Sequence, residues 1–589
     1  MNQSLPHEKH TCDFCVVGGG LAGMCAAISA ARHGLSVVIL QDRPLFGGNA
    51  SGEIRMWVCG AHGENNRETG IMEEIALENL HRNPYRTFPI WDSILYEFIR
   101  KEKNITYLLN CSCLDCTTEN SSITSVTGWQ MSTQCYHTVS AKYFADCFGD
   151  SILAPLSGAL YTSGREARAQ YNESIAPEVA DKKTMGNTCL IQARETTEKR
   201  TFIAPDWAYK FTKEEFVHRF SGNMNNPSEN FWYLELGGTQ DTITDAESLR
   251  DELLALAYGM WDYVKNSGEV SADNWELDFV GFLPGKRESR RYIGDYVMNQ
   301  NDVAGSGRFE DLVAFGGWSM DDHNPEGIRT REPATIFHPA PSPFGIPYRS
   351  LYSKNIQNLF FAGRNISVTH SAMSATRVMA TCATIGQAVG TAAYLAHRDG
   401  LSPRGVYEND LSELKQTLME DGCYLPGNAM EASSLMRSSE IISTGKHEEL
   451  LTNGYDRKIG GNENCWTGKA CDTITVLFPE VTHAESIRIA LDSDLDRKTI
   501  GAGRHVPEKA TLANRHLDVT PVHTPETLVK HLKIELTEDG KAFIPFAEIT
   551  DNHQQIIRLP IGKECRGVRI TPLATHGAEE IRIFSVNIR

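Results

Sequence analysis

One short stretch, CVVGGGLAGM at residues 15–24, limits what this chain can fold into more than any other. The apolar residues 13–17 before the glycines predict a short buried strand. The glycines have the spacing GxGxxG, and the alanine-rich residues after them predict a helix that ends at His33-Gly34. Residues 36–40, SVVIL, predict a second buried strand. The chain therefore contains one βαβ unit of about 30 residues near its start.

A turn of this kind binds a pyrophosphate, because free N–H groups and a partial positive charge meet the ligand at the helix N-terminus. The expected contacts are Gly18, Gly20, Leu21, Ala22 and Gly23. The fingerprint then requires Asp or Glu at the end of the second strand, to hold a ribose hydroxyl. This chain has Gln41, Asp42 and Arg43 there. The amide oxygen of Gln41 can accept from a hydroxyl, and so can Asp42, so the contact is open between them.

Two later segments bear on which dinucleotide is bound. Residues 42–56, DRPLFGGNASGEIRM, place Gly47 and Gly48 after the second strand, where the backbone can approach a bulky group closely. A domain that binds only a nicotinamide has no need of that turn. Residues 141–159 predict a strand, a tight turn at Gly149 and a short helix.

A third segment, residues 355–396, predicts a strand that ends at Ala362-Gly363, a loop, and a long small-residue helix from about Ser374 to Ala396. With these motifs in order, residues 12 to about 400 resemble the FAD-dependent oxidoreductases of the fumarate-reductase-like, glutathione-reductase-type flavoprotein superfamily. The resemblance rests on VVGGGLAGMCAAISAARHG, QDRPLFGGNASGEIRMWVCGAHG, LPGKRESRRYIGDYV and IPYRSLYSKNIQNLFFAGRNISVTHSAMSATRV.

The resemblance implies FAD as the cofactor and assigns further contacts. Gly47, Gly48 and Asn49 would approach the ribityl chain and the flavin. Gly149 and Asp150 match an ATGD element, although Phe148 stands in place of its threonine. Gly363 and Arg364 match a second contact, where a helix N-terminus lies near the pyrimidine edge of the flavin. That edge gains negative charge on reduction, so the helix dipole would stabilise the reduced form.

Two groups of candidate catalytic residues contain arginine, whose side chain is positively charged. His370 and Arg377 precede the last helix, and similar residues bind or polarise a substrate carboxylate in fumarate-reductase-like enzymes, with a different spacing. A structural pair is the alternative for both. Arg287 opens the run RESRR, which can bind an anion through Arg290 and Arg291 or form an ion-pair lattice with Glu288.

The other two groups centre on histidines. His323 and Asp322 could orient one another as base and partner, or form a polar turn before Pro325. His62 follows the flavin-facing glycines in GEIRMWVCGAHGE and is a further candidate base, unless it is only a loop residue. We expect no metal site, because Asp322 and His323 have no third ligand at a suitable spacing and the cysteine clusters are assigned to packing.

The predicted fold class is α/β: a Rossmann-type FAD-binding domain with an inserted domain, followed by an all-β sandwich. Residues 1–160 and 336–405 would form the FAD-binding domain, 161–335 the substrate or cap domain, 406–430 a linker and 431–589 the sandwich. The sandwich is predicted from alternating segments such as ESIRIALD and EEIRIFSVNIR. It is similar to discoidin-type, galactose-binding-like modules, many of which bind glycans while others are structural.

Composition narrows the partners. The net charge of −18 disfavours nucleic acid, which an acidic chain repels. No run of about 18 apolar residues exists, so no membrane span is predicted. The N-terminus reads as no secretory signal, and 15 cysteines without framework spacing suit a reducing compartment. We therefore expect a cytoplasmic protein.

The expected function is hydride transfer between flavin N5 and a small polar substrate, with a hydroxyl-bearing, saccharide-related compound as first choice. A base among His370, His323 or His62 would take the hydroxyl proton, and Arg377 or Arg287 would position the product. The alternatives are reduction of an activated C=C bond, with Arg377 delivering the proton, and a flavin-free glycan-binding protein. The sequence leaves the substrate and the electron acceptor open.

Overall fold

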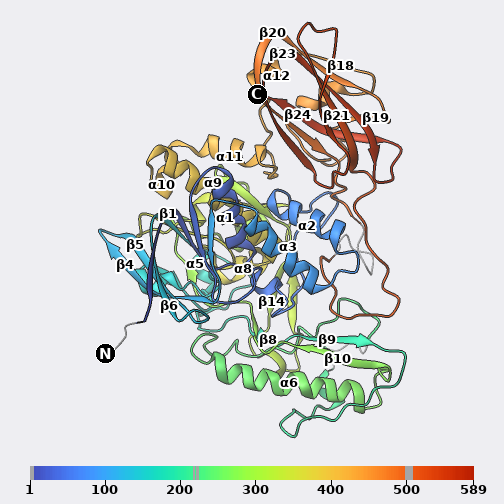
Figure 1. The fold of residues 1–589 in the computed structure, drawn as a ribbon. Helices are drawn as coiled ribbons and strands as arrows, with labels where there is room; N and C mark the ends of the chain where they lie inside the picture. The colour runs from blue at the N-terminus through green and yellow to red at the C-terminus, as the bar shows by residue number, and fades with distance from the viewer. Residues whose placement is uncertain (1–4, 217–218, 220–223, 498–508) are drawn as a thin grey trace. The chain divides into compact units, whose positions relative to one another are not determined.

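The computed structural model describes residues 5–216, 219, 224–497 and 509–589 (Figure 1). The chain forms two compact units. The first unit comprises residues 1–61, 85–414 and 509–521, and the second comprises 62–84, 415–508 and 522–589. The change of character predicted near residue 430 thus falls close to the start of a long second-unit stretch at residue 415. No pattern in the sequence indicated that residues 62–84 belong to the second unit, or that residues 509–521 belong to the first.

A seven-stranded sheet is the base of the first unit, in the order β3-β2-β1-β6-β5-β4, with β17 beside β6. The parallel strands are β1 (His7–Val17), β2 (Val37–Leu40), β3 (Ile105–Leu108), β6 (Cys135–Asp146) and β17 (Leu359–Phe361). The strands β4 (Cys111–Glu119) and β5 (Ser122–Gln130) pair antiparallel at one edge. The carboxyl ends of β1, β2, β6 and β17 therefore meet at one edge of the sheet, where α/β folds bind ligands.

The helix α1 (Leu21–Arg32) joins β1 to β2 and confirms the predicted βαβ unit. It packs closely along α9 (Met379–Asp399), because glycines stand where the helices touch. A Cβ atom on Gly386 would lie 2.0 Å from the carbonyl oxygen of Ala22, and one on Gly390 would lie 2.3 Å from that of Ala26. This packing brings the distant segment around residue 363 onto the first βαβ unit.

The single long helix expected from about Ser374 to Ala396 is instead two helices, α8 (His370–Thr376) and α9. Thr369 caps α8 by accepting a hydrogen bond from the backbone N–H of Ala372 at 3.2 Å. Val378 is extended, with φ −66° and ψ 144°, and this ends the helical run before α9 begins. Among the described residues no single helix is long and apolar enough to cross a membrane, and α8 and α9 pass that test only together, across a bend of 94°.

Short strand pairs and helices complete the first unit. The amphipathic helix α6 (Ala246–Asn266), which the sequence predicted, packs with β9 (Ile191–Glu195) and β10 (Trp275–Val280) around its own apolar core (Figure 1). Two-stranded pairs are formed by β7 (Tyr161–Thr162) with β12 (Arg291–Tyr292), β8 (Asn187–Thr188) with β11 (Gly285–Lys286), β13 (Leu312–Gly316) with β16 (Phe344–Pro347), and β14 (Met320–His323) with β15 (Thr335–His338). The remaining helices are α3 (Phe88–Arg100), α4 (Leu153–Ser157), α5 (Arg168–Tyr171), α7 (Gln300–Ala304), α10 (Pro403–Asn409) and α11 (Leu411–Glu420), the last of which crosses the division between the units.

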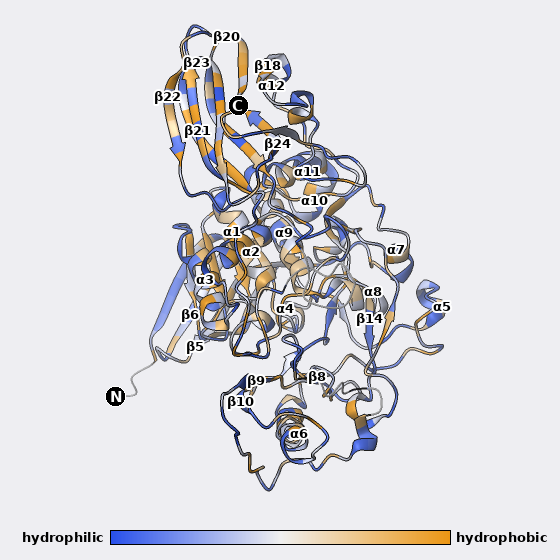
Figure 2. Ribbon diagram, turned by 90° about the vertical axis from the view of Figure 1, so that its right-hand side faces the viewer, coloured by the Kyte–Doolittle hydropathy of each residue, from blue (hydrophilic) through white to orange (hydrophobic). Residues whose placement is uncertain are grey.

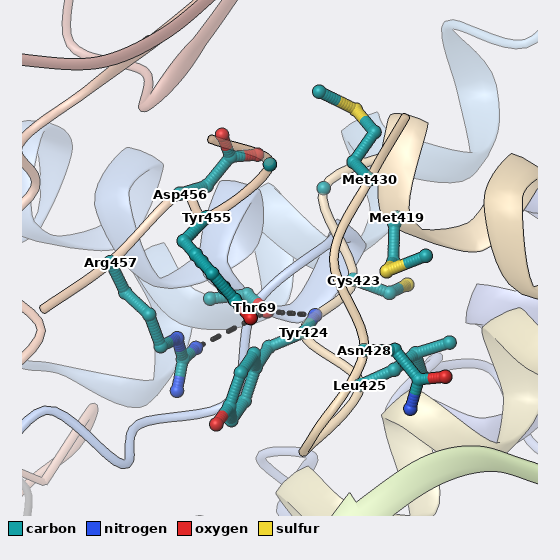
Figure 3. Close-up of a pocket in the computed structure, with 12 residues that line it drawn as sticks. Thr69, Met419, Cys423, Tyr424, Leu425, Asn428, Met430, Tyr455, Asp456 and Arg457 are labelled. Atoms are coloured by element: carbon teal, nitrogen blue, oxygen red, sulfur yellow. Dashed lines mark hydrogen bonds between the residues drawn. The ribbon is translucent and has the colours of Figure 1, made fainter. Parts of the chain in front are cut away.

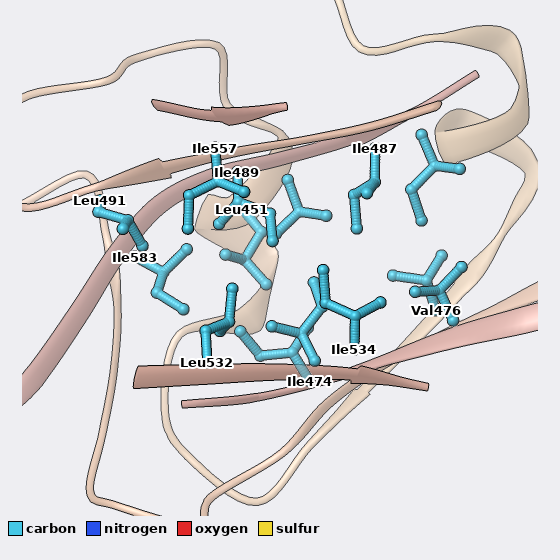
Figure 4. Packing of buried hydrophobic residues seen from close by; sticks show 14 of the residues in the cluster. Leu451, Ile474, Val476, Ile487, Ile489, Leu491, Leu532, Ile534, Ile557 and Ile583 are labelled. Carbon is cyan, nitrogen blue, oxygen red and sulfur yellow. The ribbon is translucent and has the colours of Figure 1, made fainter. Parts of the chain in front are cut away.

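The second unit is the predicted all-β region, an antiparallel β-sandwich in the strand order β19-β24-β20-β23-β21-β22, with β18 beside β20. The strands are β18 (Glu440–Ser443), β19 (Trp466–Gly468), β20 (Ile474–Leu491), β21 (Val529–Thr537), β22 (Ile544–Ile549), β23 (Ile556–Thr575) and β24 (Ile581–Ile588). The helices α2 (Ile71–Arg82) and α12 (Ser434–Ser438) belong to this unit. Hydrophobic and hydrophilic residues alternate along the strands (Figure 2), and the apolar side chains form one core (Figure 4).

From the packing of the sandwich core, we expect that deleting one buried methyl group lowers the free energy of unfolding by a modest amount. Ile489 is fully buried on β20, so Ile489→Val is expected to lower the free energy of unfolding by about 1 kcal/mol. Ile544 on β22 is 62% exposed, so Ile544→Val is the matched control and is expected to change stability by less than about 0.5 kcal/mol. Urea unfolding followed by circular dichroism measures both, and equal effects would contradict the packing in Figure 4.

Candidate active site

The turn after β1 is held open by glycines that no other residue could replace without movement. Gly18 has φ +105°, and a Cβ atom there would lie 2.6 Å from the backbone of Cys147 at the end of β6. A Cβ atom on Gly23 would lie 1.9 Å from the carbonyl oxygen of Gly18. The first and third glycines of the motif are therefore required by the packing of the turn itself.

Three glycine turns that are distant in sequence meet at this point. Gly20 and Gly47 form a parallel backbone bridge, and a Cβ atom on Gly48 would lie 3.2 Å from the Cα atom of Gly20. Gly363 has φ +116°, and a Cβ atom on it would lie 3.6 Å from that of Ala22. We call this place the glycine cradle, formed by residues 18–23, 47–48 and 363.

The two residues predicted as candidates for the ribose contact, Gln41 and Asp42, lie at the end of β2. The amide oxygen of Gln41 accepts from the backbone N–H of Gly19 at 2.8 Å, and its nitrogen donates to the carbonyl of Leu45 at 3.0 Å. Gln41 therefore joins the two loops of the cradle. The carboxyl group of Asp42 lies 3.7 Å from the side chain of Arg43, and burial raises its pKa.

Asp150 lies at the centre of a second polar cluster. Its carboxylate accepts from Lys286 Nζ at 2.7 Å, Ser289 Oγ at 2.8 Å and Arg364 Nη2 at 2.8 Å. Burial acts to raise the pKa of Asp150, but Arg364 and Lys286 outweigh it and hold the pKa below its usual range. A Cβ atom on Gly149 would lie 2.3 Å from the Arg364 guanidinium, so the glycine makes room for this pair. The structure thus brings together the two motifs at 149–150 and 363–364.

The segment 286–289 connects this cluster to a buried ionic network. Asn49 donates to the carbonyl of Lys286 at 3.0 Å, while Lys286 and Ser289 bond Asp150. Arg287 and Glu288, between them in sequence, bond a different set of groups. Residues 286–289 therefore bond Asn49 and Asp150 through Lys286 and Ser289, and bond the ionic network through Arg287 and Glu288.

The first part of the network is an imidazole held between two carboxylates. His370 Nδ1 lies 2.8 Å from Glu288 Oε2, and His370 Nε2 lies 3.1 Å from Asp322 Oδ1. Burial acts to lower the pKa of His370, but Glu288 and Asp322 outweigh it and raise the pKa to about 10. At neutral pH His370 is therefore an imidazolium, which speaks against the predicted role as a base.

The second part repeats this arrangement with other residues. His323 Nδ1 lies 2.6 Å from Glu235 Oε1, and His323 Nε2 lies 3.1 Å from Asp321 Oδ2. Arg377 pairs with Asp321 at 3.2 Å, and Arg287 lies 3.4 Å from Glu235. Four of the five predicted catalytic residues thus meet in one network, linked by the neighbouring carboxylates of Asp321 and Asp322 on β14.

Donor and acceptor chemistry sets the proton content of each array. An ionised carboxylate only accepts hydrogen bonds, whereas a neutral imidazole has one donor nitrogen and one acceptor nitrogen. An imidazole bonded to carboxylates through both nitrogens must therefore carry two protons, or one carboxyl group must be protonated.

Other residues of the predicted groups have different surroundings. Arg291 is fully buried and pairs with Glu288 and, at 2.7 Å, with Glu166, so it forms the ion-pair lattice that was the alternative for this run. The backbone N–H of Phe148 donates to Asp146 at 2.9 Å. His62 belongs to the second unit.

Sequence reasoning missed Asp321, Glu235 and Glu166. Asp321 had a signal, because the doublet Asp321-Asp322 can place one carboxylate on each side of a strand. Glu235 and Glu166 stand alone in their segments and had none. They become functional candidates only because the fold buries them against histidine and arginine.

A small hollow occurs in the second unit, away from these residues in the sequence (Figure 3). Its lining includes Tyr424, whose ring is covered by the Arg457 guanidinium at 4.0 Å. Arg457 and the backbone N–H of Tyr424 both donate to Thr69 Oγ1, at 3.5 and 3.0 Å. That face of the Tyr424 ring is thus already occupied, so it offers a saccharide no platform for stacking.

Comparison with known proteins assigns the chain to a family. The model of the FAD dependent oxidoreductase family matches residues 13–418. The chain belongs to this family. It is accordingly an FAD-dependent oxidoreductase, and the flavin-free alternative is set aside. No curated protein matches the sequence.

Solved structures resemble the two parts of the oxidoreductase at low sequence identity. A geranylgeranyl bacteriochlorophyll reductase-like protein from Thermoplasma acidophilum is 12% identical, with a TM-score of 0.32, and covers 70% of this chain and 86% of its own. The family 32 carbohydrate-binding module of Streptococcus pneumoniae EndoD is 11% identical, with a TM-score of 0.20, and covers 27% and 99%. The family 32 module of C. perfringens NanJ, solved with galactose, is 13% identical, with a TM-score of 0.18, and covers 27% and 98%.

The residues of the oxidoreductase fit FAD. The N-cap of α1 is Gly20, which makes no side-chain cap bond, and the first turn carries no acidic residue, so an anion can bind its N–H groups. Three buried polar atoms near the cradle motifs have no hydrogen-bond partner among the described residues: Arg43 Nη1, Ser51 Oγ and Arg364 Nε. A dinucleotide with ribose, phosphate and ring oxygens supplies acceptors for such donors.

Proposed function

We propose that this oxidoreductase oxidises a hydroxyl group of a small polar substrate, with saccharide-related compounds as the first class to test. The observation that carries the proposal is the segment 286–289, which bonds Asp150 and Asn49 on one side and the histidine network on the other. The glycine cradle would hold FAD, which would supply two-electron chemistry as the acceptor of a hydride. The contacts predicted for FAD from the sequence remain part of this proposal.

The network's own residues would manage charge and protons. His370 stays protonated at neutral pH and, with Arg287 and Arg377, presents fixed positive charge to the oxygen of the substrate. The array of Glu235, His323 and Asp321 would take up the hydroxyl proton on Glu235 Oε2, which is buried and has no hydrogen-bond partner among the described residues, while His323 holds the other carboxylate oxygen in place. Buried, already oriented groups need little rearrangement for this task.

Reduction of an activated C=C bond is the second candidate, and Arg377 supports it. The Nε atom of Arg377 is buried and has no hydrogen-bond partner among the described residues, so it can donate to a substrate carboxylate. Reductive and oxidative half-reactions separate the two candidates. Anaerobic bleaching of the flavin by polyols or sugars supports oxidation, whereas reoxidation of the reduced flavin by unsaturated acids supports reduction.

His323→Gln tests the proton role. Glutamine has an amide in place of the imidazole ring and cannot exchange a proton as the ring does. We expect the flavin content of the variant to stay unchanged. We expect the rate of flavin reduction by the best substrate to fall about 100- to 10,000-fold. Stopped-flow absorbance measures this rate. His397→Gln is the control, because His397 is outside the network and its ring lies 3.7 Å from a different carboxylate, that of Asp13. An unchanged rate in His323→Gln would remove His323 from the mechanism.

A further inference from the structure

Two histidines face each other on neighbouring strands of the first sheet, outside the network and the cradle. His10 lies on β1 and His137 on β6, and these strands are parallel with Glu8 opposite His137. His10 Nε2 lies 2.9 Å from His137 Nδ1. The His137 side chain is 4% exposed, and that of His10 is 20% exposed. The pair therefore has a rigid, buried member and a member at the surface.

Gln130 fixes which nitrogen of His137 carries its proton. The Gln130 amide nitrogen donates to the carbonyl of Leu109 at 2.8 Å, so its oxygen must be the atom that faces His137. That oxygen lies 3.3 Å from His137 Nε2 and also accepts from Thr133 Oγ1 at 2.6 Å. Nε2 is therefore the protonated nitrogen, and the lone pair is at Nδ1, which points toward His10. Metal-binding histidines are oriented in this way by an outer acceptor.

A carboxylate completes the group. Glu8 Oε2 lies 3.6 Å from His137 Nδ1 and 3.9 Å from His10 Nε2. Two ligands that are each about 2.1 Å from one ion are about 3 to 4 Å apart, which is the range of all three separations here. We propose that Glu8, His10 and His137 bind one divalent transition-metal ion of the Zn²⁺ class.

The donor set selects this class of ion. Two imidazole nitrogens and one carboxylate oxygen suit Zn²⁺ and its first-row neighbours, whereas Ca²⁺ and Mg²⁺ prefer oxygen ligands. The bound ion would tie the first residues of β1 to β6. It would act apart from the flavin chemistry.

Calorimetric titration of the EDTA-treated holoenzyme with Zn²⁺ tests the proposal. We expect one saturable site per chain in the wild type and a higher thermal unfolding temperature with the ion, because binding to the folded state stabilises it. His10→Gln and Glu8→Gln change partly exposed side chains and are expected to remove this site. Gln130→Leu keeps all three ligands and is expected to weaken binding about 10- to 100-fold.

His516→Gln is the control, because Glu195, His516 and Asp518 form the other group of three close donors among the described residues. That group has a single imidazole, so its variant is expected to bind Zn²⁺ like the wild type. The proposal is overturned if the wild type shows no saturable site, or if His10→Gln keeps the site at full affinity. Loss of the site in His516→Gln alone would also overturn it. Unfolding temperatures of the metal-free variants show whether each is folded.

Discussion

Gly20→Ala is expected to yield a folded protein that has largely lost FAD. Gly20 has φ −67° and ψ 175°, which alanine adopts freely, and the atom nearest to an added Cβ is Gly48 Cα at 4.0 Å. The protein itself therefore accepts the methyl group. The pyrophosphate does not, because the second glycine of the fingerprint lets the backbone approach it closely. We expect FAD affinity to fall on the order of 100-fold, or about 2.7 kcal/mol.

The measurement is the amount of FAD that acid releases per mole of protein after gel filtration. The thermal unfolding temperature of the FAD-free protein shows whether the variant is folded. Gly461→Ala is the matched control, because a Cβ atom there meets no atom within 4 Å. Gly23→Ala is a poorer test, since its Cβ would lie 1.9 Å from the Gly18 carbonyl oxygen and would disturb the turn itself. Full retention of FAD by Gly20→Ala would show that the pyrophosphate does not approach residue 20.

Glu288→Gln is expected to destabilise the first unit by about 3 to 5 kcal/mol, because each of two buried cations, Arg291 and His370, loses one of the two carboxylates that it contacts. Glu288 is fully buried and pairs with Arg291 and His370, and it accepts from the backbone N–H of Met185 at 2.9 Å. Burial acts to raise the pKa of Glu288, but His370 and Arg291 outweigh it and lower the pKa. Glutamine keeps the shape of the side chain, removes its charge and places an NH2 donor where one acceptor oxygen was, facing a group that also donates.

The destabilisation should depend on pH through His370. Its folded-state pKa of about 10 lies above the ordinary value of 6.5, so its charge stabilises the folded state fully below pH 6.5. This contribution is lost as the pH rises through 10. The difference between wild type and Glu288→Gln is therefore expected to shrink as the pH rises from 6.5 toward about 10, and Arg291 keeps it above zero.

Urea unfolding across that pH range measures the difference. Glu326→Gln is the matched control, because Glu326 pairs with Lys183 at 3.0 Å at the surface, with both side chains more than 40% exposed. A surface pair contributes at most about 1 kcal/mol. If Glu288→Gln cost no more than Glu326→Gln, the carboxylate would not be compensating buried charge.

Local patterns in the sequence were sufficient for the first βαβ unit. The GxGxxG turn, the apolar strands on either side and the alanine-rich helix between them all lie within about 30 residues, and each depends on contacts that are close in sequence. The same holds for the sandwich strands, whose period of two follows from a single buried face. Helix α6 was predicted for the same reason, from its single apolar stripe.

The position of the break between α8 and α9 was decided by tertiary contacts. Small residues run through both helices, so their composition gives no reason for a bend. The backbone N–H of Ala380, in the first turn of α9, donates to the carbonyl of Cys59 at 2.9 Å. That partner comes from another part of the fold, and a local pattern contains no information about it.

The sequence by itself determined that this chain has a dinucleotide-binding βαβ unit, a later segment that returns to it, and a C-terminal sandwich. Only the tertiary structure decided which charged residues meet. Glu235 and Glu166 stand alone in the sequence, where they are indistinguishable from solvated charges, and Asp322 bonds His370 rather than His323, beside which it was expected to act. Strand and helix periods are local, whereas a buried ionic network depends on how distant segments exclude water from one another.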